Sequence, residues 1–128
     1  MRQIKLGDAV VSAQGGPWAL FLYNGEFAED GKKANWYEDR ERGLVLNEDG
    51  TMERDPLFLL KTLWAMAANA AEVDGGTFPR FKEWARALDI PMGPGAAWTS
   101  EVVAAIFAEI FRLGAGDEKQ EGGQGERE

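Results

Sequence analysis

The chain has 128 residues, a net charge of −8 and five tryptophans, and it contains neither histidine nor cysteine. Because these two residue types carry most nucleophilic, general-base and metal-ligand chemistry near neutral pH, we expect no enzymatic activity, no metal site and no cofactor. The negative charge disfavours nucleic acid and anionic membranes as partners, since both are bound through basic patches.

The first sixteen residues predict a β-hairpin. Ile4 and Leu6 alternate with Lys5, Gly7 and Asp8 supply the turn, and residues 9–11 continue as a second strand. A two-stranded hairpin is marginal by itself, so we expect it to pack on helices or on another strand.

A Gly-Gly-Pro break at residues 15–17 comes before a segment with helical spacing. Proline suits the first position of a helix, because its missing N–H would have no partner there. Trp18, Phe21 and Leu22 follow at helical spacing, whereas a strand over residues 18–23 lacks alternation. The pattern therefore favours a helix.

The pattern of residues 31–55 does not decide between regular secondary structure and a loop. A short polar helix over residues 34–42 would carry Trp36 and Tyr37, and residues 44–52 resemble a small hairpin around the turn at Asp49 and Gly50. The length and acidic charge of this segment suit a mobile loop equally well, so both interpretations stay open.

Residues 57–73 form the clearest helix. Asp55 is a good N-cap before Pro56, and its charge suits a helix N-terminus. Apolar side chains cover nearly the whole circumference, which places the helix at the centre of the fold or reserves one face for a partner. Gly75 and Gly76 end it.

Two further amphipathic helices are expected after residue 76. Thr77 can cap the first, and Thr99 or Ser100 can cap the last. We expect Phe81 and Trp84 to be buried on one face of the first helix. The buried stripe of the last helix is expected to consist of Val103, Ile106, Phe107, Ile110 and Leu113.

These elements predict a single α+β domain over residues 1–113, with an N-terminal β-hairpin packed on a mainly helical body of three to four helices. Residues 57–73 are expected at its centre. Residues 114–128 are acidic and have no side chain that can enter a core, so we expect a disordered acidic tail there. No apolar run approaches the length of a membrane span, and the absence of cysteine fits a reducing cytoplasm.

The aromatic residues carry the only positive functional signal, because tryptophan is enriched where proteins bind one another. Four of them lie off the predicted buried stripes or beside breaks in the chain, and each is equally consistent with core packing. These candidates for partner contact are Trp18, Phe21, Trp98 and Phe111. The acids Glu26, Glu29 and Asp30 are expected to form a solvated face, since a hard-cation site needs several convergent oxygens.

Four segments, taken in order, resemble one family. They are IKLGD at residues 4–8, GGPWALFLYNGEFAED at 15–30, DPLFLLKTLWAMAANAAE at 55–72 and FPRFKEWARALD at 78–89, followed by an amphipathic helix. They contain a Leu-Tyr-x-x-x-Phe-x-x-Asp element at residues 22–30, a Leu-Trp-Ala-Met element at 63–66 and a Phe-x-x-Trp element at 81–84. This order is similar to that of the tail assembly chaperones of long-tailed bacteriophages and prophages, apart from an acidic insert between residues 30 and 55.

The resemblance implies a non-enzymatic role in the cytoplasm of a bacterial host. The expected partner is the tape-measure protein, a long apolar helical chain that is kept soluble while tail-tube subunits, a further candidate partner, polymerise around it. A homo-oligomer and a longer, frameshifted form stay open. The alternative suggested by charge is an acidic mimic of nucleic acid that inhibits a DNA-binding protein, which would bind in a strongly salt-dependent way.

Overall fold

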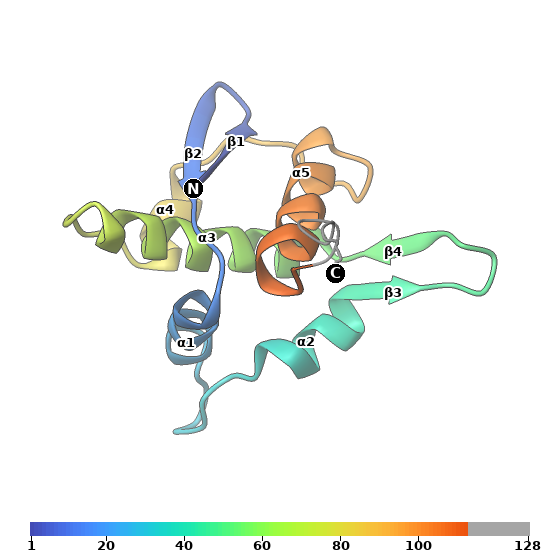
Figure 1. Ribbon diagram of the computed structural model, residues 1–128, viewed down its shortest axis with the longest axis horizontal. Helices are drawn as coiled ribbons and strands as arrows, with labels where there is room; N and C mark the ends of the chain where they lie inside the picture. Colours follow the sequence, from blue (N-terminus) through green and yellow to red (C-terminus); the bar gives the residue numbers. More distant parts are fainter. Residues whose placement is uncertain (113–128) are drawn as a thin grey trace, which may run out of the picture.

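A computed structural model describes residues 1–112 and confirms the predicted α+β architecture. A central 18-residue helix, α3 (Pro56–Val73), crosses the middle of the molecule, and the other elements pack around it (Figure 1). These are β1 (Arg2–Leu6), β2 (Ala9–Ala13), α1 (Pro17–Glu26), α2 (Trp36–Gly43), β3 (Leu44–Leu46), β4 (Met52–Arg54), α4 (Phe81–Arg86), α5 (Ala97–Ala105) and a π-helical turn, η1 (Ile106–Ile110). The predicted tail at residues 114–128 lies outside the described residues.

The N-terminal hairpin forms as predicted. β1 and β2 pair antiparallel, with Arg2 opposite Ala13 and Leu6 opposite Ala9. Gly7 has a φ of 64° in the turn, a conformation that a residue without a Cβ adopts at little cost. The hairpin packs through β1 on α5 and through β2 on α3, which supplies the support that an isolated hairpin lacks.

Helix α3 is the core of the fold, as its all-round apolarity predicts. The Asp55 carboxylate accepts the backbone N–H of Leu57 at 2.9 Å, so the predicted N-cap is confirmed. Leu59, Leu63 and Met66 are completely buried. The helix also binds the chain after β2, because the N–H of Gln14 donates to the carbonyl of Met66 at 2.9 Å.

Residues 31–55 fold into both elements that their sequence suggests, and the interpretation as a loop is wrong. Helix α2 packs on α3 through Trp36, whose indole N–H donates to the Thr62 hydroxyl at 2.9 Å. Gly43 allows close approach, since a Cβ there would lie 2.5 Å from the Phe58 ring. Strands β3 and β4 then form the second hairpin, which projects away from the body (Figure 1).

The predicted caps of the last two helices are wrong. Helix α4 begins at Phe81, and the N–H of Phe81 donates to the Glu26 carboxylate at 2.7 Å. An acid on α1 therefore accepts the first N–H of α4, in place of the predicted cap Thr77. Helix α5 begins at Ala97, and the Thr99 hydroxyl inside it donates to the carbonyl of Ala96 at 2.6 Å. Ser100 is also inside α5 and accepts a hydrogen bond from Arg54 instead.

The two C-terminal helices are less deeply buried than their patterns predict. Phe81, Trp84 and Phe107 are half-buried and pack against the rim of the core. Within the predicted stripe of the last helix, Val103 and Ile106 are buried, Ile110 is half-buried, and Leu113 lies outside the described residues. Within residues 1–112, no helix combines the length and apolarity that crossing a membrane requires.

Candidate functional site

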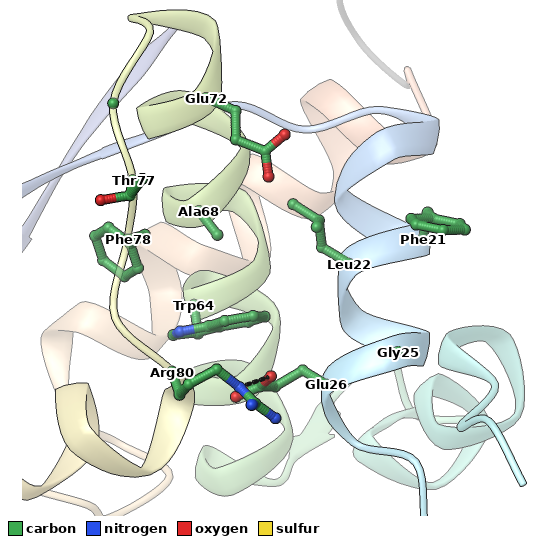
Figure 2. A pocket seen from close by; sticks show the side chains of 11 residues that line it. Phe21, Leu22, Gly25, Glu26, Trp64, Ala68, Glu72, Thr77, Phe78 and Arg80 are labelled. Carbon is green, nitrogen blue, oxygen red and sulfur yellow. Dashed lines mark hydrogen bonds and ion pairs between the residues drawn. The ribbon is translucent and has the colours of Figure 1, made fainter.

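An apolar groove of about 470 Å³ lies between α1 and α3. The two helices run in opposite directions along it, as the order of Phe21 and Gly25 on α1 and of Trp64 and Glu72 on α3 shows (Figure 2). The segment at residues 76–80 borders the groove beside α3. Its apolar lining consists of Phe21, Leu22, Trp64, Ala68 and Phe78.

Helical periodicity places the lining side chains of each helix on one wall of the groove. On α3, Trp64, Ala68 and Glu72 are spaced by four residues and therefore lie above one another. On α1, Leu22 and Gly25 are three residues apart and face the same space. The small side chains of Ala68 and Gly25 leave that space open.

Two large aromatic side chains stand exposed on α1 beside the groove. Phe21 borders the groove with its ring on the side of α1 away from Trp64 (Figure 2), and Trp18 adjoins the groove through Glu72. Trp18 is 48% exposed and Phe21 is 53% exposed, and their rings stack with centroids 4.5 Å apart. The indole N–H of Trp18 donates to Glu72 at 3.0 Å, which ties α1 to the end of α3. The Lys33 ammonium lies 5.3 Å from the Phe21 ring centroid. These contacts hold the pair in one orientation, so a partner would meet a preformed surface.

The segment at residues 76–80 is held to both helices by polar contacts. The Glu26 carboxylate on α1 accepts hydrogen bonds from Arg80 Nε at 2.6 Å and from the N–H of Phe81 at 2.7 Å. The indole N–H of Trp64 on α3 donates to the carbonyl of Pro79 at 2.9 Å. Glu26 is therefore occupied by structural contacts, and it closes the end of the groove opposite Glu72 (Figure 2).

The four aromatic candidates for partner contact lie in different places in the structure. Trp18 and Phe21 lie together on α1 beside the groove, where Phe21 is a lining residue and Trp18 contacts the lining residue Glu72. Trp98 is only 3% exposed, and its indole N–H donates to the carbonyl of Pro91 at 2.6 Å, so it belongs to the core. Phe111 is half-buried with its centroid 5.7 Å from that of Trp36, and the Arg40 guanidinium lies 5.8 Å from its ring. Neither Trp98 nor Phe111 lines the groove, and Trp18 is tied to it by the hydrogen bond to the lining residue Glu72.

Several groove residues were not predicted from the sequence. Trp64, Ala68 and Phe78 form much of the lining, and Glu72 and Glu26 set its two ends. The four-residue spacing of Trp64, Ala68 and Glu72 was a usable signal, because it places a large aromatic, a small residue and an acid in line on one side of α3. The contact between Trp18 and Glu72, which are 54 residues apart, had no local signal.

Two side chains with shifted pKa values lie outside this groove. Burial raises the pKa of the Tyr23 hydroxyl well above its usual value, and its hydrogen bond to Asp39 at 2.7 Å adds to the effect. Hydrogen bonds from the hydroxyl and N–H of Thr51 lower the pKa of Asp49 in the exposed β3–β4 turn. Among residues 1–112, no three acidic side chains are grouped as metal ligands would be.

No family model, curated protein or solved structure matches this chain. The similarity to tail assembly chaperones therefore stays a prediction from the sequence pattern. The groove itself is an open apolar channel between two helices, with two exposed, stacked aromatic side chains beside it on α1.

Proposed function

We propose that this protein is a non-enzymatic tail assembly chaperone that holds an apolar helical segment of a tape-measure protein in the groove between α1 and α3. The observation that carries the proposal is the stacked pair of Trp18 and Phe21. Both side chains are about half exposed beside an apolar groove. They stay exposed although α1, the helix that carries them, packs other side chains into the core.

The shape of the groove suits a helix better than an extended chain. A groove between two antiparallel helices accepts a third helix in the same way that bundles are built, with side chains of one helix entering the gaps of the others. From Trp64 to Glu72 the wall on α3 is about 12 Å long at 1.5 Å per residue, or roughly two turns. A client would therefore present apolar anchors at positions i, i+3 or i+4, and i+7.

The charge of the chain is compatible with such a client. The lining of the groove is mainly apolar, whereas the chain as a whole carries a net charge of −8. A complex that hides the apolar face of the client and adds negative charge resists self-association. Two elements of the family-like pattern also meet here, since Leu22 and Trp64 line opposite walls.

The proposal is tested by co-expression with a tape-measure protein whose apolar helices make it insoluble alone. The wild type is expected to keep the client soluble and to co-purify with it. Trp18→Ala and Phe21→Ala should each weaken capture, because aromatic contacts at the centre of an interface are worth about 2 kcal/mol or more. Tyr37→Ala is the matched control, since Tyr37 is an aromatic residue as exposed as Phe21 but lies on α2.

Salt dependence separates this function from nucleic-acid mimicry. Apolar capture should change little between low and physiological salt, whereas binding through a row of acids would weaken steeply. If the wild type neither solubilises the client nor co-purifies with it, the chaperone function is wrong. If all three alanine variants capture the client as well as the wild type does, the function stands and the groove is wrong.

A further inference from the structure

One end of the groove between α1 and α3 carries an unbalanced negative charge. Glu72 is an exposed lining residue in the last turn of α3, and within residues 1–112 it takes part in no ion pair. At the opposite end, Glu26 is paired with Arg80 at 2.6 Å (Figure 2). That pair leaves its end of the groove close to neutral, so Glu72 is the charge that a bound chain would meet.

The position of Glu72 within α3 makes its charge unfavourable in the free protein. The C-terminal end of a helix carries a partial negative charge, which disfavours an acid and favours a base in the last turn. The last turn of α3 contains no basic residue. A cation brought by a partner would therefore be attracted both by the carboxylate and by the end of the helix.

The hydrogen bond from Trp18 does not account for this charge. The indole N–H donates to Oε1 of Glu72 at 3.0 Å, and a neutral glutamine could accept the same bond through its amide oxygen. Within the described part of the chain only Oε1 is engaged, so Oε2 stays open to a donor from a partner. The contact with Trp18 also holds the side chain in place, which lowers the entropy cost of pairing there.

We propose that Glu72 selects the client, because the groove prefers apolar helical segments that carry a lysine or arginine beside their apolar anchors. This inference rests on the proposed function, since it concerns a helix held in the same groove. Trp64, Ala68 and Phe78 meet the apolar anchors, and Glu72 pairs with the basic side chain. Glu72 is thus a specificity-determining residue, whereas the apolar lining supplies most of the affinity.

The spacing of the wall on α3 sets where the basic residue lies in the client. Glu72 is four residues beyond Ala68 on the same side of α3, which is about one helical turn. The basic side chain of the client therefore lies within about one turn of its outermost anchor. Lysine and arginine suit this position, because their aliphatic stems cover apolar surface while the charged end reaches the rim.

The probes are synthetic amphipathic peptides that share one set of apolar anchors and differ at one flanking position. That position holds Lys, Gln or Glu and lies one helical turn beyond the outermost anchor. It comes before the anchors in one set of peptides and after them in another, so that both directions of a helix in the groove are covered. Fluorescence anisotropy of a dye on the peptide measures each dissociation constant at low salt.

Wild-type protein should discriminate among the peptides of the set whose direction fits the groove. It should bind the Lys peptide about threefold more tightly than the Gln peptide, and the Glu peptide about threefold more weakly, as expected for one ion pair at an exposed rim. High salt should remove most of this preference, because it screens exposed charges.

Two substitutions separate the charge of Glu72 from the charge of the whole chain. Glu72→Gln keeps an acceptor for Trp18 and removes the charge, so the preference for Lys over Glu should disappear. Glu41→Gln is the matched control, since it removes one charge from an exposed acid on α2, which does not line the groove. This control should keep the wild-type preference. Circular dichroism checks that both variants are folded.

Three results would overturn the inference. The first is equal affinity for the Lys, Gln and Glu peptides in both sets, in which case the groove binds helices without reading their charge. The second is a preference for Lys that persists in Glu72→Gln, since another group must then supply it. The third is that no peptide binds, and capture of the tape-measure protein then decides the proposed function separately.

Discussion

At the scale of single residues, the buried hydroxyl of Tyr23 links stability to pH. Tyr23 is almost completely buried on α1, and it donates to Asp39 Oδ2 on α2 at 2.7 Å. Burial, followed by the Asp39 hydrogen bond and charge, raises the pKa of this hydroxyl in the folded state. In the unfolded chain tyrosine ionises near about pH 10. Its contribution to stability is therefore complete below that pH and declines above it.

Tyr23→Phe should lower the free energy of unfolding by about 1 kcal/mol at neutral pH, since it removes one hydrogen bond. Above about pH 10 the difference from the wild type should shrink, because only the wild type must keep a tyrosine protonated in order to fold. Urea unfolding followed by circular dichroism measures both effects. Tyr37→Phe, at an exposed tyrosine, is the control and should match the wild type at each pH. A gap that stays constant from neutral to alkaline pH would contradict the linkage.

Residue-scale contacts also explain what the sequence could not reveal. The cap of α4 comes from Glu26, which is 55 residues away from Phe81 along the chain, so inspection of the residues next to α4 pointed to Thr77 instead. Trp98 follows a Gly/Pro-rich stretch that predicts exposure, yet the Pro91 carbonyl accepts its indole N–H and allows it to be buried. Polar partners outside the adjacent residues decided both outcomes, 55 residues away for α4 and seven residues away for Trp98.

At the scale of elements, Glu26 fixes the segment that borders the groove. It is the last residue of α1, and it binds both Arg80 and the first N–H of α4. Glu26→Gln keeps the size of the side chain but removes its charge, which reduces such hydrogen bonds by about 1 kcal/mol. The amide of Phe81, and those of Phe78 and Arg80 beside it, should then exchange with deuterium roughly fivefold faster, given about 1.4 kcal/mol for each factor of ten.

The control for this measurement is Glu29→Gln, which removes one negative charge three residues later in the chain. The backbone of Glu29 pairs with Lys32, and its side chain makes no hydrogen bond to α4. Exchange in α3 should be unchanged in both variants. Equal protection of the Phe78, Arg80 and Phe81 amides in the wild type and in Glu26→Gln would show that this carboxylate does not hold the segment.

Elements with strong local patterns were predictable, and their relative placement was not. The β1–β2 turn, the Asp55 cap and the apolar circumference of α3 are encoded within a few residues each, and the structure confirms them. The groove needs α1 and α3 to meet, and these helices are separated by the whole of residues 27–55. The sequence identified Trp18 and Phe21 as candidates, but their stacking and their contact with Glu72 depend on tertiary packing.

At the scale of the whole molecule, the C-terminal segment should be dispensable for folding. Residues 116–128 contain no apolar side chain, so their removal deletes nothing that a core could bury. A chain ending at residue 115 should therefore melt within a few degrees of the full-length protein and unfold as cooperatively. Differential scanning calorimetry of the two proteins makes the comparison. A large fall in melting temperature, or a broad transition, would show that this segment supports the fold.

The distribution of indole side chains has an optical consequence. Trp36, Trp64 and Trp98 are buried and Trp84 is half-buried, so Trp18 is the one tryptophan of the five that faces solvent widely. Its emission should dominate the red side of the spectrum and be the most accessible to a dissolved quencher such as acrylamide. A chain that binds in the groove and also covers Trp18 beside Glu72 would shift this emission to the blue and protect it. The protein thus carries its own fluorescent reporter at the candidate site, with no label attached.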